Sequence, residues 1–168
     1  KRYLGSFSDH DLRELGVGFF LHDLGKTRID PAILNKQGRL TEKERLEVQK
    51  HPQDGFDILK EVDQVSHESK TIILQHHERD DGSGYPNGLK GDEIHLYARI
   101  CSLADVYDAL TCDRPYRNKL SPFMALKLIK RELLGHVQKS LFEGFVFMLG
   151  ESNRELIYGE PYKYSMSL

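Results

Sequence analysis

The stretch QHHERDDGSGYPNGLKGDEI, residues 75–94, decides how the chain is interpreted, because two adjacent histidines end an apolar run and a loop with four glycines follows. Ile72, Ile73 and Leu74 lead into the histidines and predict a helix over residues 67–77. A loop as long as residues 80–93 inside a domain is usually functional or disordered. After the loop, ARICSLADVYDALTC (98–112) is apolar almost all round, which predicts a buried central helix.

The remaining segments also have helical patterns, with little strand signal. Ser8 can cap a helix that carries Leu12, Leu15 and Phe19 on one stripe and extends toward residues 22–23. Thr41 with Glu44 forms a capping box that opens another helix. Two more helices are expected at 122–134 and 138–149. We therefore predict an all-α fold, a compact bundle of about six to eight helices in a single domain spanning residues 1–168.

Composition excludes several classes of protein. The formal net charge is −2 over 168 residues, so no strongly basic face is implied and we expect no DNA partner. No apolar run approaches the roughly 20 residues that a membrane helix needs, so no membrane contact is expected from this domain. Cys101 and Cys112 fall in one predicted helix, about 16 Å apart at the standard helical rise, and cannot bridge each other. A reducing, cytoplasmic setting is expected.

Several histidines and aspartates stand in positions suited to metal binding. His22 and Asp23 extend an apolar stripe, where an ionised aspartate is costly unless it is paired or metal-bound. A buried His–Asp hydrogen bond is the alternative interpretation. Asp105 lies in the apolar helix and needs a partner, which could be a metal or a salt-bridging residue such as Arg114.

His76 and His77 would point about 100° apart on a regular helix. This spacing suits two neighbouring ions or two sides of one cluster better than a single ion. Dinuclear hydrolytic sites hold their ions roughly 3.5–4 Å apart, often with a bridging carboxylate. Mixed nitrogen and oxygen ligands suit iron, manganese, nickel or zinc.

The order of these motifs along the chain resembles a known family. HDLGK (22–26), KHP (50–52), HHERDDGSGYP (76–86), LADVYDALT (103–111) and DRPYR (113–117) closely resemble the HD-GYP domain of metal-dependent phosphohydrolases. The resemblance implies a helical bundle of the HD-domain type with a long Gly-rich GYP loop. It also implies a di- or trinuclear metal centre, usually iron-containing, and a bacterial signalling enzyme that hydrolyses cyclic di-GMP to linear pGpG or GMP.

The resemblance assigns roles residue by residue. Asp23 is implied as the bridging metal ligand and Lys26 as a catalytic residue next to the metals. The implied metal ligands are His22, Asp23, His51, His76, His77 and Asp105. The implied substrate-binding residues are Lys26, Asp81, Tyr85, Arg114 and Arg117.

The chain departs from the family pattern upstream of the HD pair. Family members carry a further histidine ligand, and trinuclear members a glutamate, well before that pair, but only 21 residues precede His22. We therefore expect a chain truncated at its N-terminus that lacks a first helix and a regulatory domain. A GGDEF-type protein is a candidate partner of the GYP loop. Two alternative functions stay open: a non-catalytic cyclic di-GMP receptor or interaction module acting through that loop, and a phosphohydrolase acting on another nucleotide.

Overall fold

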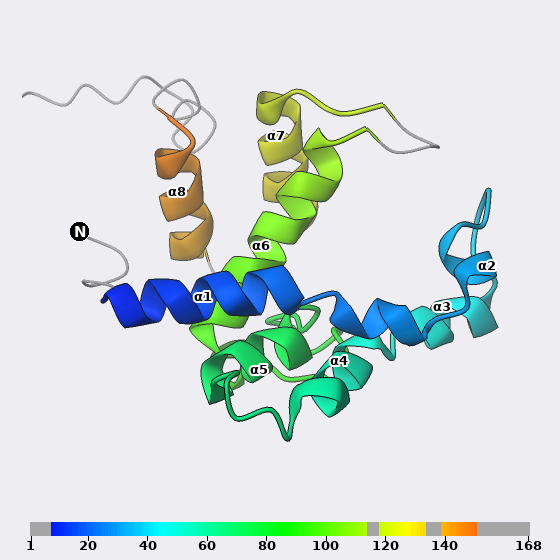
Figure 1. The fold of residues 1–168 in the computed structure, drawn as a ribbon. Coiled ribbons are helices and arrows are strands. Elements are labelled where there is room, and N and C mark those ends of the chain that lie inside the picture. The colour runs from blue at the N-terminus through cyan, green and yellow to red at the C-terminus, as the bar shows by residue number, and fades with distance from the viewer. Residues whose placement is uncertain (1–7, 114–117, 134–138, 151–168) are drawn as a thin grey trace, which may run out of the picture. The chain divides into compact units, whose positions relative to one another are not determined.

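The computed structural model describes residues 8–113, 118–133 and 139–150. These residues form eight α-helices and two 3-10 helices, and no named strand, so the all-helical prediction is confirmed for them (Figure 1). The elements are α1 (Asp9–Leu21), η1 (Leu24–Arg28), α2 (Pro31–Leu34), α3 (Glu42–Val48), α4 (His51–Leu59), α5 (His67–Gln75), η2 (Gly91–Glu93), α6 (Leu96–Thr111), α7 (Pro122–Leu133) and α8 (Lys139–Met148).

Local sequence determines where several helices begin. The Ser8 side chain accepts the backbone N–H of Asp11 while the Asp11 carboxylate accepts the N–H of Ser8, which is a complete capping box at the start of α1. Thr41 and Glu44 form the same reciprocal pair at the start of α3. Both predicted starts are therefore confirmed. None of the described helices has both the length and the apolar character needed to cross a membrane.

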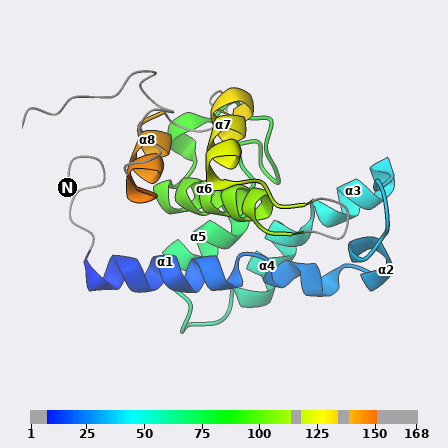
Figure 2. The ribbon, with the colours of Figure 1, turned by 90° about the horizontal axis from the view of Figure 1, so that it is seen from above.

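The chain divides into two units, and the first ends at Asp105 while the second begins at Val106. In the first unit, α5 packs against both α1 and α4, and η1 packs on α4. Figures 1 and 2 show α1 running alongside α5 in two perpendicular views. Ile72 and Ile73 of α5 are fully buried in this layer, so α5 is the central helix of the unit. In the second unit, α7 and α8 bury Leu126, Ile129 and Phe142.

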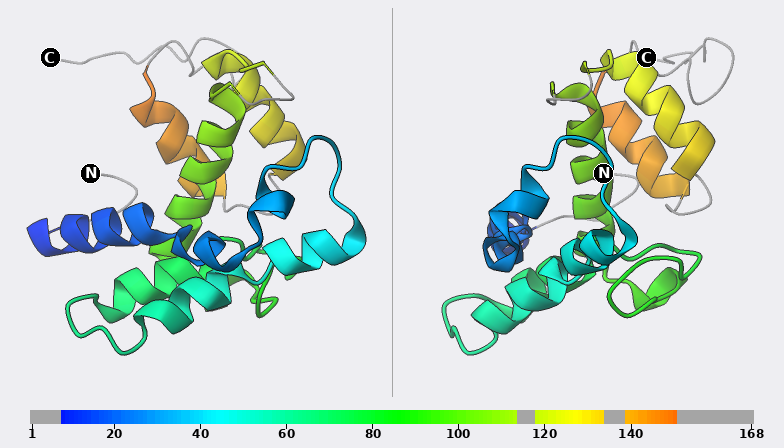
Figure 3. Two further views of the ribbon diagram at one scale, coloured as in Figure 1. Left: turned by 45° about the vertical axis from the view of Figure 1, so that its right-hand side comes forward. Right: turned by 90° about the vertical axis from the view of Figure 1, so that its right-hand side faces the viewer.

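The loop between α5 and α6, green in Figure 3, turns back on itself. Asp81 and Lys90 form an isolated antiparallel bridge across it. Arg99 of α6 donates hydrogen bonds to the carbonyl oxygens of Ile94 and Gly91 and pairs with Asp92 at 3.2 Å. The predicted long loop is therefore confirmed, and its backbone is held by specific bonds.

Gly25 allows η1 to lie directly on α4. A side chain at this buried position would overlap the carbonyl oxygen of His51, and its Cβ would lie 2.6 Å from the backbone nitrogen of Gly55. The close contact between these two backbones brings Asp23, just before η1, next to His51, which begins α4.

Gly25→Ala should destabilise the protein by about 1–3 kcal/mol, the usual cost of overpacking, because backbone atoms cannot move aside as a flexible side chain can. Urea unfolding followed by circular dichroism measures the change. Gly16→Ala is the matched control, because Gly16 is exposed on α1 with open space around it and alanine favours helix. Equal stability of Gly25→Ala and the parent protein would contradict this packing.

Candidate metal centre

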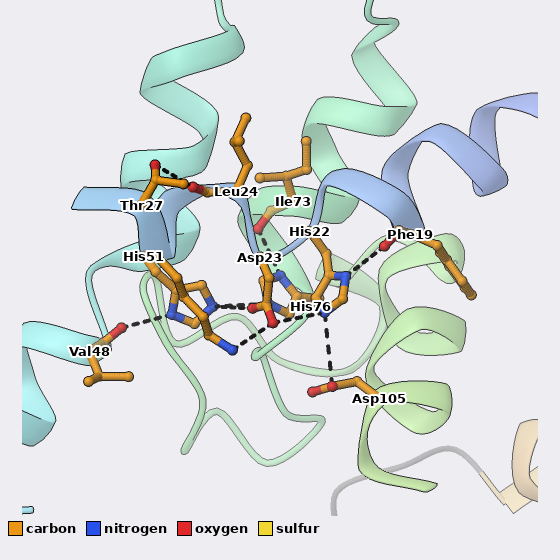
Figure 4. A network of polar contacts seen from close by, with 11 residues as sticks. Phe19, His22, Asp23, Leu24, Thr27, Val48, His51, Ile73, His76 and Asp105 are labelled. Atoms are coloured by element: carbon orange, nitrogen blue, oxygen red, sulfur yellow. Dashed lines mark hydrogen bonds and ion pairs between the residues drawn. The ribbon is translucent and has the colours of Figure 1, made fainter. Parts of the chain in front are cut away.

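Three histidine rings are held at helix ends by their own backbone. His22 is the first residue after α1, His76 is the first after α5, and His51 follows the end of α3 by three residues. In each, ring Nδ1 is hydrogen-bonded to the carbonyl oxygen three residues earlier (Figure 4). The acceptors are Phe19, Val48 and Ile73, at 2.6, 2.7 and 2.8 Å. Carbonyls in a last helical turn lack the usual helical donors, so they are available for this bond.

These bonds fix the tautomer of each ring. A carbonyl oxygen can only accept, so Nδ1 must carry the proton, and a neutral ring then presents Nε2 as a lone pair. The Nε2 atoms of His51 and His76 lie only 3.2 Å apart. Two lone pairs at this distance repel each other unless a proton or a cation lies with them.

Asp23 lies among these nitrogens. Its Oδ1 is 3.3 Å from Nε2 of His51 and 4.0 Å from Nε2 of His76, and its Oδ2 is 3.4 Å from Nε2 of His22. Asp105, from α6, adds an oxygen 3.9 Å from Nε2 of His22 (Figure 4).

Possible ligand atoms of Asp23, His51, His76 and His77 all lie within 4.8 Å of one another. His22 and Asp105 flank this group through the contacts just described. The first unit therefore brings together all six residues predicted to bind metal.

Two buried atoms at the centre lack a hydrogen bond. Neither Nε2 of His22 nor Oδ1 of Asp23 has a hydrogen-bond partner among the described residues, although both lie at ion-pair distance from neighbours. A buried polar atom left unpaired costs roughly 1–3 kcal/mol. A cation would satisfy both atoms, and the negative ends of the α1, α3 and α5 dipoles also favour one. The residues present therefore fit a metal centre.

The ionisation of the cluster is consistent with cation binding. Desolvation lowers the pKa of His51, and lowers that of His76 to about 3, so both rings stay neutral and able to ligate. Desolvation also lowers the pKa of His77. Burial would raise the pKa of Asp23, but the His22 and Lys26 side chains beside it lower it below its ordinary value. The adjacent Asp23 carboxylate raises the pKa of His22.

The prediction that His76 and His77 lie on a regular helix is wrong. The helix α5 ends at Gln75, and His76 is its C-cap residue. The 100° separation of a continuous helix therefore does not apply, and the two ring centroids lie 4.2 Å apart with an interplanar angle of 43°. Both rings contact the same cluster.

The other predicted site residues occupy three kinds of position. Nζ of Lys26 donates to Oδ2 of Asp23 at 2.6 Å, at the half-exposed edge of the cluster. Tyr85 lies on the ring of His77, with centroids 4.8 Å apart. The Asp81 carboxylate accepts the backbone N–H of Ser83 within the loop. Arg114 and Arg117 lie outside the described residues, so their substrate contacts stay predictions.

Sequence reasoning missed two kinds of functional group. The carbonyls that orient the histidines have no side-chain signal, although each histidine's place just after a predicted helix could have indicated them. Glu78 was also missed: it is buried, and its carboxylate accepts backbone N–H groups of the loop. Only its position directly after the two histidines indicated a role.

Comparisons with known proteins agree with this geometry. The family model described as HD domain matches residues 5–140. The chain is 42% identical over 139 residues to the cyclic di-GMP phosphodiesterase PA4108 of Pseudomonas aeruginosa, covering 83% of this chain and 33% of that protein. It is 40% identical over 131 residues to the 3'3'-cGAMP-specific phosphodiesterase 3 of Vibrio cholerae, covering 76% of this chain and 28% of that protein.

A solved structure has the same fold. Bd1817, a HDG"Y"P protein from Bdellovibrio bacteriovorus, superposes with a TM-score of 0.69 at 21% identity, over 84% of this chain and 45% of that one. The chain belongs to the HD domain family, and the predicted resemblance to HD-GYP domains is confirmed. It spans about a third or less of the length of these two phosphodiesterases.

Asp23→Asn should lower bound metal to less than a tenth of the parent level, because the amide keeps the shape of the carboxylate but loses its charge and one acceptor. Elemental analysis of protein purified with added Mn²⁺ measures the content. Asp54→Asn is the matched control, since Asp54 pairs with Arg28 outside the cluster. Equal metal content in Asp23→Asn and the control would contradict the assignment.

Proposed function

We propose that this chain is a metal-dependent phosphodiesterase domain that hydrolyses cyclic di-GMP to linear pGpG or GMP. The observation that carries the proposal is the Asp23 carboxylate enclosed by His51, His76 and His77, with two buried atoms that lack a hydrogen bond and that a cation would satisfy. The family membership and the name of the Pseudomonas relative support cyclic di-GMP as the substrate.

The two oxygens of Asp23 face different partners, and this supports a bridging role. Oδ1 lies toward His51 and His76, whereas Oδ2 lies toward His22, which is itself close to Asp105. In a two-metal centre, His22 and Asp105 would hold one ion and His51, His76 and His77 the other. Iron is the proposed metal, with manganese, nickel and zinc as the alternatives that the same ligand set accepts.

Bound metal ions supply Lewis acidity and a nucleophilic hydroxide at neutral pH. The side chains of the chain provide positioning and charge. The Lys26 ammonium, held at the edge of the cluster by Asp23, is placed to stabilise negative charge on the phosphoryl oxygens or to give a proton to the leaving oxygen. Arg114 and Arg117 are proposed to grip phosphate or guanine edges bidentately, and Tyr85 and Asp81 to border the substrate.

A second substrate is supported by one specific observation. The Vibrio relative is 40% identical to this chain, close to the 42% of the Pseudomonas relative, and it is named for 3'3'-cGAMP. Both dinucleotides present a phosphodiester of the same class to the cluster, so the base-contacting residues decide between them. A GGDEF-type partner for the GYP loop is the corresponding proposal for a protein contact.

The metal-loaded protein, prepared with Mn²⁺ or with Fe²⁺ under reducing conditions, should hydrolyse cyclic di-GMP. Chromatography of the products distinguishes pGpG from GMP, and 3'3'-cGAMP and cyclic AMP in parallel reactions test substrate choice. Faster cleavage of 3'3'-cGAMP would replace the proposed substrate. Binding of cyclic di-GMP by calorimetry with no product would instead identify a receptor.

Lys26→Met should lower kcat roughly 100-fold, within the range for a lost acid–base group, while leaving metal content near the parent level. Steady-state kinetics and elemental analysis on the same preparation separate the two effects. Lys60→Met is the matched control, because Lys60 caps the end of α4 opposite His51 and is exposed. An unchanged kcat would remove Lys26 from the catalytic residues.

A further inference from the structure

Glu78 is a buried carboxylate that the proposed chemistry does not use. It directly follows His77, and only 4% of it is exposed. Burying a charge is costly unless it is hydrogen-bonded. Its two oxygens accept the backbone N–H groups of Asn87 and Leu89, at 2.7 and 2.9 Å. The charge of Glu78 is therefore used to hold the distal part of the GYP loop.

The proximal part of the same loop lies against the backbone of residues 77–79. The N–H of Tyr85 donates to the carbonyl oxygen of His77 at 3.2 Å. Gly84 leaves no room for a side chain: a Cβ there would lie 2.5 Å from backbone atoms of Glu78 and Arg79. Hydrogen bonds and close backbone packing thus hold loop residues on both sides of Pro86 against residues 77–79.

These hydrogen bonds and backbone contacts place the Tyr85 ring against the His77 ring. The two ring planes are inclined by only 31°, with centroids 4.8 Å apart, and the ring of His51 lies 6.4 Å from that of Tyr85. Desolvation raises the pKa of the Tyr85 phenol to about 12, so the ring is neutral at physiological pH.

His77 differs from the other three histidines of the cluster. His22, His51 and His76 are oriented by bonds from Nδ1 to backbone carbonyls. Within the part of the chain that the structure describes, the ring of His77 has no such bond, and it contacts the rings of His51, His76 and Tyr85. The Tyr85 ring therefore takes the orienting role that a carbonyl has elsewhere.

We infer that Glu78 is a positioning residue: by holding the N–H groups of Asn87 and Leu89, its carboxylate keeps the Tyr85 ring against His77 and so fixes that ligand for metal binding. The inference rests on the proposed function only in taking His77 as a metal ligand. It goes beyond the proposed function by assigning part of the GYP loop to the metal site.

The test uses Glu78→Gln, Tyr85→Leu and the double variant. Glutamine keeps the size of Glu78, but its NH₂ group opposes one of the two loop donors. Hydrogen exchange at the amides of Asn87 and Leu89 should become about tenfold faster in Glu78→Gln, as loss of a charge-assisted bond implies. Tyr85→Leu, with the carboxylate in place, should leave both amides protected.

Metal binding supplies the second readout. Mn²⁺ affinity by calorimetry should fall roughly tenfold in each single variant, the lower end of the range for residues behind a ligand. The double variant should be no weaker than either single variant, because both changes act through one contact. The visible spectrum of bound Co²⁺ should change alike in both, since it reports ligand geometry.

Glu93→Gln is the matched control, because Glu93 accepts the backbone N–H of Lys90 at the exposed end of the same loop. It should leave Mn²⁺ affinity and the Co²⁺ spectrum unchanged. Additive losses in the double variant, or unchanged Mn²⁺ affinity in Tyr85→Leu, would overturn the inference. If circular dichroism shows that Glu78→Gln does not fold, the Mn²⁺ affinity and the Co²⁺ spectrum of Tyr85→Leu decide the inference.

These readouts do not depend on turnover. Absence of phosphodiesterase activity in the parent protein, with the metal effects present, would remove the proposed function and leave the positioning role. Normal activity in the parent protein, with Mn²⁺ affinity unchanged in both variants, would remove the positioning role and leave the proposed function.

Discussion

The candidate site depends on the hydrogen bonds between three histidine Nδ1 atoms and backbone carbonyls in the last turns of helices. They assign the proton to one side of each ring and the lone pair to the other, so His22, His51 and His76 present acceptors inward. The Asp23 carboxylate adds negative charge among them. A cation would relieve the electrostatic repulsion among these groups, and the rest of the fold places the helix ends around this position.

The packing of the first unit brings the helix ends that carry these histidines together. The helices α1 and α4 both pack on α5, so the ends of α1 and α5 and the start of α4 lie close together. Gly25 permits the close backbone contact that brings the Asp23 segment to His51. Asp105 joins from α6 through its contact with His22. The proposed ligands therefore come from four separate stretches of chain, and bonds to backbone carbonyls orient three of them, His22, His51 and His76.

Much of this could be predicted from the sequence, because capping residues and motif order are local signals. Ser8 and Thr41 predicted two helix starts, and the order of HD, HP, HH and AD motifs predicted which residues meet. The end of α5 at Gln75 could not be predicted, since no glycine or proline interrupts the pattern there. The partners of Glu78 also escaped prediction, because its acceptor role depends on how a loop without periodicity folds back. The single-domain expectation and the roles of Arg114 and Arg117 stay predictions.

The wide separation of His22, His51 and His76 along the chain has a consequence for folding. A metal centre held by these residues and by Asp23 would act as a cross-link that closes two long loops of chain, much as a disulfide does. Its binding free energy would then add to the stability of the native state and depend on the free metal concentration. The residues proposed to bind metal would therefore make the stability of the folded domain depend on the metal available around it.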